Sequence, residues 1–264
     1  MIRPLLQYLL RARDEHALHS PFLYDLYTTV IRPRPVPVEP AFVAIEAIRR
    51  QLRTRTEYIE VRDYGAGSKH SNAPRRRVAT IARNAEKPPK YGQLLYRLIR
   101  RFRPETILDL GTSLGVTTLY EAAAAQAAAA QASGQVLTFE GCPETARLAQ
   151  ENFRALNLTN IDLTVGNLDE TLPERVGTLD RVDFAFFDAN HRYEPTVRYF
   201  ETCLTKARPD SLFVFDDIHW SPEMEQAWRS IKAHPRVTVT VDLFQVGLVF
   251  FRTEQPKQHF VLRY

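Results

Sequence analysis

The sequence has little cysteine, no long apolar run and little net charge. Its 264 residues include two cysteines, Cys142 and Cys203, too few for a disulfide framework or a cysteine-based metal site. No stretch of about 18 apolar residues occurs, and charged residues soon break the short apolar runs of the first 20 residues. We therefore expect a cytoplasmic protein that makes no contact with a membrane.

The charge balance argues only weakly for a nucleic-acid partner. The formal net charge is +4, and arginines gather in "RRQLRTR", "PRRR" and "RLIRRFR". Such clusters could contact phosphates, but solvated helix faces explain them as well. No aromatic-interleaved platform for single strands and no recognisable DNA-binding motif accompanies them. Nucleic acid is therefore an unlikely partner.

The chain changes character near its first third. Residues 1–90 contain short helical patterns, the proline-rich "RPRPVPVEP" and a mixed segment, 61–77, that could be a lid over a bound molecule or a plain surface loop. Residues 91–264 instead alternate apolar strands with helical segments. We expect an N-terminal helical region, 1–90, followed by one α/β domain, 91–264.

Seven strand-like runs define the expected α/β fold. They are "TILDL", "VLTFE", "IDLTV", "VDFAFF", "LFVF", "VTVTVDLF" and "VGLVFF". Helices are expected over 115–132 and 143–157, which separate the first three strands, and over 194–206, between the fourth and fifth strands; another helix begins after Ser221 and Pro222. Continuous apolar strands separated by helices predict a mostly parallel sheet covered on both faces, and the last two runs predict an antiparallel hairpin.

Acids and glycines stand where the first two strands end. Ligands of parallel sheets bind at the carboxyl ends of the strands. Asp109, Gly111 and Gly115 form a D-x-G-x-x-x-G turn after the first strand, and glycines let a backbone approach a ligand closely. Glu140 ends the second strand, where a carboxylate can accept both hydroxyls of a ribose. The pair predicts a nucleoside-binding site.

The turn lacks the middle glycine of the usual dinucleotide motif and has an acid beside it, which suits a cationic ligand better than a phosphate. Here the sequence resembles the class I S-adenosylmethionine-dependent methyltransferases. "KYGQLL", "DLGTSLGVTT", "VGNLDETLP" and "FFDANHRYEPT" look like the O-methyltransferases that act on catechols and on sugars of natural products. The resemblance covers roughly residues 90–252. It implies a Rossmann-like seven-stranded sheet, with S-adenosylmethionine as cofactor.

The resemblance also implies roles for single residues. Asp109 and Gly111 would lie near the amino acid end of the cofactor, and Glu140 would bind its ribose. Thr117 would lie near the cofactor carboxylate, and Gly166, Asn167 and Leu168 would line the adenine. The resemblance also assigns cofactor contacts to Thr112, Ser113, Gly115, Gly141 and Asp188.

Two adjacent acids, Asp216 and Asp217, follow the strand "LFVF" and should repel one another. In the related enzymes a divalent cation, usually Mg²⁺, is held by acids at the places of Asp188, Asp216 and Asp217, and oxygen ligands suit that ion. Without a cation, clustered carboxylates would take up a proton or move apart. The alternative is that the pair caps the following helix or faces water.

Two histidines are candidates for the base that activates the acceptor hydroxyl. His191 stands three residues after Asp188, where some related sugar enzymes carry a base. His219 is the second candidate, and either could be an ordinary hydrogen-bonding residue. Asp188 is also assigned to the catalytic set.

The leading hypothesis is transfer of a methyl group to a hydroxyl of a small-molecule acceptor, with a possible homodimer as the assembly. A nucleic-acid methyltransferase is the alternative, although no Asn/Asp-Pro-Pro-Tyr/Phe motif follows "VDFAFF". A cofactor-binding protein without catalysis and a nicotinamide-dependent dehydrogenase are the further alternatives. The acceptor itself is not predicted, because residues 1–90 match neither related group.

Overall fold

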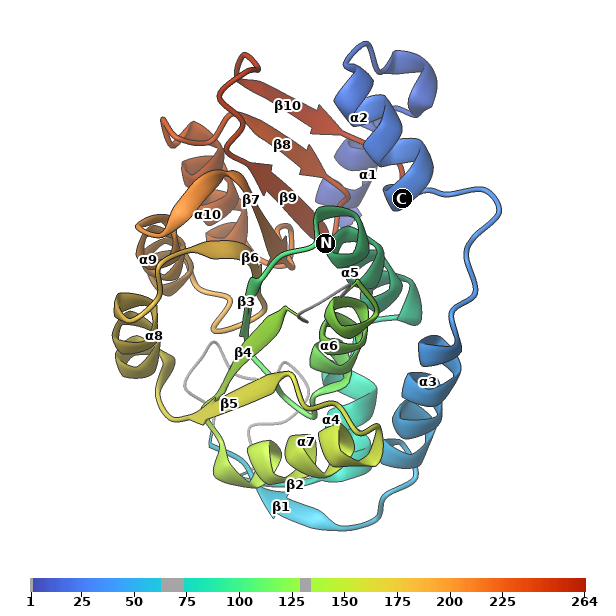
Figure 1. Cartoon of the computed structure of the whole chain (residues 1–264), viewed down its shortest axis with the longest axis vertical. Helices are drawn as coiled ribbons and strands as arrows, with labels where there is room; N and C mark the ends of the chain where they lie inside the picture. Colours follow the sequence, from blue (N-terminus) through green and yellow to red (C-terminus); the bar gives the residue numbers. More distant parts are fainter. Residues whose placement is uncertain (1, 63–73, 129–133) are drawn as a thin grey trace. The chain divides into compact units, whose positions relative to one another are not determined.

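The computed structural model of the protein describes residues 2–62, 74–128 and 134–264 (Figure 1). The chain forms two compact units. The central unit is Pro37–Thr171, and the terminal unit combines Met1–Val36 with Leu172–Tyr264. These units cut across the expected boundary at residue 90, so the division into 1–90 and 91–264 stays a prediction.

The central unit is built on three parallel strands. β3 pairs with β4, and β4 pairs with β5, all in parallel. Their carboxyl ends therefore meet at one edge. The bounds are α3 Pro40–Leu52, β1 Tyr58–Glu60, β2 Arg75–Arg77, α4 Val78–Ala85, α5 Pro89–Phe102, β3 Thr106–Leu110, α6 Val116–Ala128, β4 Gln135–Glu140, α7 Pro143–Ala155 and β5 Ile161–Val165.

The terminal unit contains parallel and antiparallel strands. β6 and β7 are parallel, β7 and β8 both pair with β9 in antiparallel fashion, and β10 lies parallel to β8. The bounds are α1 Ile2–Arg11, η1 Glu15–Ala17, α2 Pro21–Asp25, η2 Leu26–Ile31, β6 Val182–Phe187, α9 Tyr193–Leu204, β7 Ala207–Asp216, α10 Pro222–Ala233, β8 Val239–Asp242, β9 Val246–Phe250 and β10 Gln258–Val261. Helix α8, Leu168–Gly177, belongs to both units, because the central unit ends at Thr171 and the terminal unit resumes at Leu172.

Proline fixes where many of the helices begin. The ring of proline presets the helical φ and its missing N–H costs nothing in the first turn. Within the described ranges, five helices begin at a proline, namely α2 at Pro21, α3 at Pro40, α5 at Pro89, α7 at Pro143 and α10 at Pro222. The hydroxyl of Ser221 adds a cap by accepting the Met224 N–H at 3.1 Å.

All seven predicted strands are present as β3 to β9, and the expected antiparallel hairpin is β8 with β9. The predicted α/β, Rossmann-like class is confirmed. Strand β10 and helix α8 were not predicted. The expected lid segment, 61–77, falls mainly on residues 63–73, outside the described residues, and so does the end of the helix expected to reach residue 132.

Among the described residues, no helix is long and apolar enough to span a lipid bilayer.

Candidate functional site

The glycine turn after β3 adopts the backbone that its sequence suggests. Gly111 and Gly115 have φ values of +117° and +82°, and Ser113 is left-handed at +49°. A side chain at Gly115 would also collide with Phe153, since a Cβ there would lie 2.6 Å from the Phe153 ring. Glycine is therefore required at residue 115 for both backbone shape and space.

Glu140 lies opposite this turn, at the end of β4. Its carboxylate accepts the backbone N–H of Ser113 at 2.7 Å and that of Cys142 at 2.9 Å. Burial raises the pKa of Glu140 to about 7, although the two backbone N–H groups favour the ionised form. The carboxylate is thus fixed in orientation at the edge where β3, β4 and β5 end.

Asp109 lies beneath the turn and is fully buried. Its Oδ2 accepts hydrogen bonds from the hydroxyls of Thr118 at 2.6 Å and Thr138 at 2.8 Å, and Thr138 Oγ1 also lies 2.5 Å from Thr112 Oγ1. Burial raises the pKa of Asp109 against these hydrogen bonds. These contacts give Asp109 and Thr112 a role in holding β3, β4 and α6 together. Their predicted place beside the cofactor stays a prediction.

The end of β5 completes this edge of the central unit. Gly166 has a φ of +156°, and its N–H donates to the Glu140 carbonyl at 3.0 Å. Asn167 begins α8, because its side-chain oxygen accepts the Asp169 N–H at 3.1 Å. Three further residues of the predicted cofactor set, Thr117, Gly141 and Leu168, are half-buried. The predicted cofactor set in this unit therefore gathers at the carboxyl ends of three adjacent strands.

In the terminal unit, the loop after β6 holds His191 beside Asp188. The two side chains approach within 3.4 Å, between His191 Nε2 and Asp188 Oδ1, and both are partly exposed. Asn190 and His191 have positive φ values, +67° and +51°, which are uncommon for non-glycine residues, although Asn and His adopt them more often than most. The ring of Trp220, from the loop after β7, lies 5.7 Å from the His191 ring. These contacts bring the two loops together.

The two acids at the end of β7, Asp216 and Asp217, differ in their surroundings. Asp216 is fully buried, whereas Asp217 has a left-handed backbone, φ +53°, and its carbonyl accepts the Trp220 N–H at 2.8 Å. Helix α10 is capped by Ser221, so neither acid serves as its N-cap. In the described part of the chain, no three His, Cys, Asp or Glu residues are grouped to hold a metal ion. The geometry thus gives the set Asp188, Asp216 and Asp217 no support as a Mg²⁺ site, and that set stays a prediction.

His219, the second candidate base, is occupied by carboxylates. Its Nε2 lies 2.8 Å from Asp242 Oδ2, its Nδ1 lies 3.5 Å from Glu225 Oε1, and its ring stacks on Phe244 at 5.5 Å. Burial lowers the pKa of His219, but the hydrogen bond and charge of Asp242, with Glu225, outweigh burial and raise it. These contacts favour a structural role over base catalysis.

Comparison with known proteins agrees with this geometry. Residues 108–218 match the family described as a methyltransferase domain. A catechol O-methyltransferase from Niastella koreensis is 30% identical over 132 residues, which cover 49% of this chain and 57% of that protein. The chain thus spans little more than half the length of this relative.

Two solved structures share the fold. The O-methyltransferase from Bacillus cereus in complex with SAH is 18% identical, with a TM-score of 0.58 over 82% of this chain and 93% of that one. The SAH-bound methyltransferase PaMTH1 from Podospora anserina is 14% identical, with a TM-score of 0.62 over 89% and 97%. The resemblance predicted from the sequence is confirmed.

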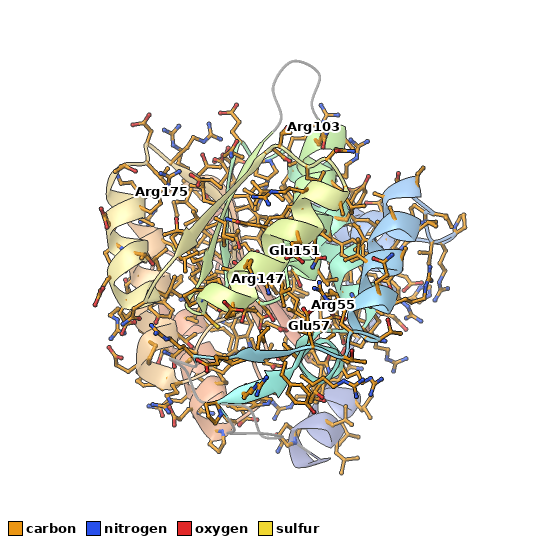
Figure 2. The ribbon with its side chains drawn as sticks, turned by 90° about the horizontal axis from the view of Figure 1, so that it is seen from below. Arg55, Glu57, Arg103, Arg147, Glu151 and Arg175 are labelled. Atoms are coloured by element: carbon orange, nitrogen blue, oxygen red, sulfur yellow. The ribbon has the colours of Figure 1, made fainter. Side chains whose placement is uncertain are left out.

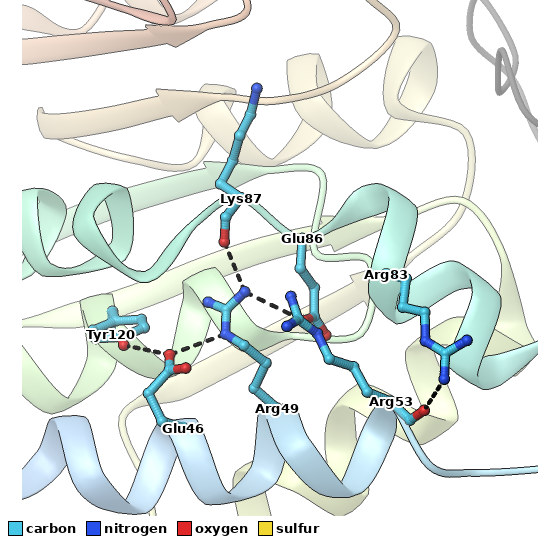
Figure 3. Close-up of polar contacts among 7 residues, drawn as sticks. All are labelled: Glu46, Arg49, Arg53, Arg83, Glu86, Lys87 and Tyr120. Atoms are coloured by element: carbon cyan, nitrogen blue, oxygen red, sulfur yellow. Dashed lines mark hydrogen bonds and ion pairs between the residues drawn. The ribbon is translucent and has the colours of Figure 1, made fainter.

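In the central unit, α3 carries a buried charge cluster that the sequence analysis did not predict (Figure 3). Arg49 is almost fully buried, and it donates to Glu46 at 2.9 Å, Glu86 at 3.2 Å and the Lys87 carbonyl at 2.7 Å. The hydroxyl of Tyr120, on α6, donates to the same Glu46 at 2.8 Å. Within the central unit the cluster fastens α3 to α6 and to the start of α5.

A second set of ion pairs holds α7, the helix that follows Glu140, in place. Arg55 pairs with Glu57 at 2.7 Å and with Glu151 of α7 at 3.2 Å, and Arg147 pairs with Glu151 as well (Figure 2). These ion pairs are partly exposed, so each contributes little by itself. Three arginines of the run "RRQLRTR" therefore form ion pairs within the chain, namely Arg49, Arg53 and Arg55.

Proposed function

We propose that the protein transfers a methyl group from S-adenosylmethionine to a hydroxyl of a small-molecule acceptor. The observation that carries the proposal is the fixed Glu140 carboxylate facing the Gly111–Gly115 turn. The catechol O-methyltransferase relative and the two SAH-bound structures support it.

In the central unit, a carboxylate and a glycine turn support the proposed cofactor site. Glu140 presents a carboxylate for the ribose hydroxyls, and Gly111, with a φ of +117°, leaves the backbone of the turn without a side chain at that point. When bound, S-adenosylmethionine supplies a methyl group on a positively charged sulfur, which the acceptor oxygen displaces. The backbone at Gly166 and the helix start at Asn167 would border the adenine.

In the terminal unit, His191 would take the proton of the acceptor hydroxyl. Its Nε2 faces Asp188 at 3.4 Å, so the carboxylate can orient the ring and stabilise the imidazolium that forms. The ring of Trp220 borders the same loop and would limit the space left for the acceptor. Proton transfer by such a positioned base contributes typically ~10²–10⁴-fold to the rate.

No step in this proposal passes through a metal ion. A divalent ion held by Asp188, Asp216 and Asp217 would lower the pKa of an acceptor hydroxyl. The described residues give that arrangement no support, so activation by His191 alone is the simpler proposal.

The cofactor assignment can be tested without knowing the acceptor. Mass spectrometry of ligands that co-purify with the protein should find S-adenosylmethionine or its demethylated product. Calorimetry should then show binding of both molecules and none of NAD. Binding of NAD alone would contradict the proposal and favour a dehydrogenase.

The catalytic assignment needs an acceptor panel of catechols, other phenols and sugars, assayed with and without a chelator. His191→Ala should slow transfer about a hundredfold or more while leaving cofactor affinity unchanged. His234→Ala is the matched control, because His234 is about as exposed and lies 3.7 Å from Glu201. Loss of activity with the chelator would restore the metal hypothesis. Equal activity of both variants would contradict the role of His191.

Binding without turnover on every acceptor would favour a cofactor-binding protein that does not catalyse transfer. Salt-sensitive retention of RNA or DNA would favour the nucleic-acid alternative. The expected homodimer and cytoplasmic location are separate predictions, and light scattering of the purified protein tests the first of them.

A further inference from the structure

His219 ties the turn after β7 to two other elements of the terminal unit. Its Nε2 lies 2.8 Å from Asp242 Oδ2, at the end of β8, and its Nδ1 lies 3.5 Å from Glu225 Oε1, in the first turn of α10. The side chain of His219 is 20% exposed. Contacts with carboxylates are strong and directional, so they fix the orientation of this ring more firmly than that of a surface side chain.

The Asp242 anchor is itself fixed. Its Oδ1 accepts the Phe244 N–H at 2.8 Å, so one carboxylate holds both the turn between β8 and β9 and the His219 ring. The Phe244 ring stacks on the His219 ring, with 21° between the two planes, and the Tyr8 ring of α1 packs on Phe244 at 5.2 Å. His219 is therefore held along its edge by carboxylates and against its face by an aromatic ring.

The turn that contains His219 ends at Trp220. The Trp220 N–H donates to the Asp217 carbonyl at 2.8 Å, which closes a four-residue turn with Ile218 and His219 at its centre. Ile218 is 1% exposed and anchors the turn in the core, but apolar burial is non-directional. The polar contacts of His219 therefore orient the turn, and with it the direction in which Trp220 leaves it.

Trp220 lies beside the proposed catalytic base. Its ring centroid is 5.7 Å from that of His191, within the range of paired aromatic rings. On its other side, His191 Nε2 lies 3.4 Å from Asp188 Oδ1. A displacement of Trp220 would therefore change both the packing of the His191 ring and the space in front of it.

We propose that His219 is a positioning residue for methyl transfer. Its contacts with Asp242 and Glu225 hold Trp220 against His191, and Trp220 sets where the acceptor hydroxyl lies relative to His191 Nε2. The inference rests on the proposed function, in which His191 takes the acceptor proton. Both ring nitrogens of His219 face carboxylates, so His219 acts through Trp220 and not as a base.

The position of Trp220 can be tested without an acceptor, because the chain has two tryptophans and the other, Trp228, is buried. In the Trp228→Phe background all tryptophan emission comes from Trp220. His219→Leu should shift that emission to longer wavelength and increase its quenching by acrylamide. His219→Gln keeps a donor for Asp242 and should restore most of the original signal. If Trp228→Phe does not fold, the difference between each protein and its Trp220→Phe counterpart gives the same signal.

His234→Leu is the matched control. His234 ends α10, its side chain is 21% exposed, it lies 3.7 Å from Glu201 Oε1, and its ring packs on Phe200. The variant therefore loses a histidine with similar burial, one acidic neighbour and one aromatic neighbour. It should leave the Trp220 emission unchanged, and circular dichroism should show that all the variants are folded.

Rate measurements on an acceptor for which His191→Ala is slow connect the position of Trp220 to catalysis. A small misplacement beside the reacting groups lowers the rate steeply, so His219→Leu should lower kcat about ten- to a hundredfold. Calorimetry should show unchanged affinity for S-adenosylmethionine. His219→Gln should recover most of the rate, and His234→Leu should keep all of it.

Unchanged Trp220 emission in His219→Leu would overturn the inference, and so would an equal shift in His234→Leu. A wild-type kcat in His219→Leu, although Trp220 has moved, would also overturn it. Failure of the proposed function looks different. The wild type would then transfer no methyl group, or His191→Ala would keep full activity, while the Trp220 emission would still respond to His219→Leu.

Discussion

The Glu140 carboxylate accepts the backbone N–H of Ser113 at 2.7 Å. This hydrogen bond joins the end of β4 to the middle of the glycine turn after β3. A ligand that uses the carboxylate therefore finds it already oriented, so little conformational entropy remains to be lost on binding. The geometry of the proposed cofactor site depends on this contact and on the second N–H, from Cys142.

Glu140→Ala should weaken binding of S-adenosylmethionine by about 1.5–3 kcal/mol, because charged hydrogen bonds to the ribose are lost. Calorimetry measures the change. Glu144→Ala is the control, since Glu144 is exposed in the first turn of α7 and pairs only loosely with Arg147, at 3.6 Å. Unchanged affinity in the Glu140 variant would rule out the assigned ribose contact.

Binding should also depend on pH through the same carboxylate. Burial raises the pKa of Glu140 to about 7, so most of the free protein is protonated there at pH 6 and ionised at pH 8. Ribose hydroxyls donate to the ionised form, so affinity should rise up to about tenfold from pH 6 to pH 8. Calorimetry on Glu140→Gln should show no such rise. Parallel pH profiles for the two proteins would contradict the prediction.

The glycine turn and Glu140 could be predicted from the sequence because their signals are local. Glycines between a strand and a helix report a backbone shape, and an acid at a strand end needs only the strand assignment. The pair formed by His191 and Asp188 was also accessible, since the residues are three apart.

The partners of Asp109 and His219 were not accessible, because they come from other parts of the chain. Asp109 accepts from Thr138, 29 residues away, and His219 faces Asp242, 23 residues away. A sequence pattern shows that such side chains are polar, but only the packed sheet shows which neighbours take up their hydrogen bonds. The sequence therefore predicted a cofactor contact for Asp109 and a catalytic role for His219, whereas the structure shows both side chains bound to other residues of the chain.

Gly92 in α5 offers a test of the packing around Tyr120. A Cβ at residue 92 would lie 2.4 Å from the Tyr120 ring, so Gly92→Ala should lower the free energy of unfolding by about 1–3 kcal/mol. Helix propensity alone predicts a gain of up to about 1 kcal/mol. Gly177→Ala, at the end of α8, is the control, because nothing lies within 4 Å of its Cβ. Urea unfolding should separate the two, and a stabilised Gly92→Ala variant would show that Tyr120 moves aside freely.

The buried cluster on α3 should make stability depend on pH. Burial raises the pKa of Glu86 to about 7, even though Arg49 and Arg53 lower it. The unfolded value is near 4.5, so the Glu86 contribution to stability falls as pH rises from 4.5 to 7 and is constant above that. Glu86→Gln should remove this slope in urea unfolding experiments. A variant that retained the wild-type slope would assign it to another group.

Arg49→Met should cost about 3–5 kcal/mol, because it leaves the buried Glu86 carboxylate and the Lys87 carbonyl without their shared donor. Loss of the cation raises the pKa of Glu86 further, so at pH 6 the carboxyl is protonated in the variant and much of the cost is avoided. The gap to the wild type should therefore widen from pH 6 to pH 8. Replacing both Arg49 and Glu86 by Met should cost less than Arg49→Met alone at pH 8, since the Glu86 carboxylate is then no longer left buried without Arg49. Urea unfolding at the two pH values measures all three proteins, and an equal gap at both would mean that Glu86 is not the group that Arg49 keeps ionised.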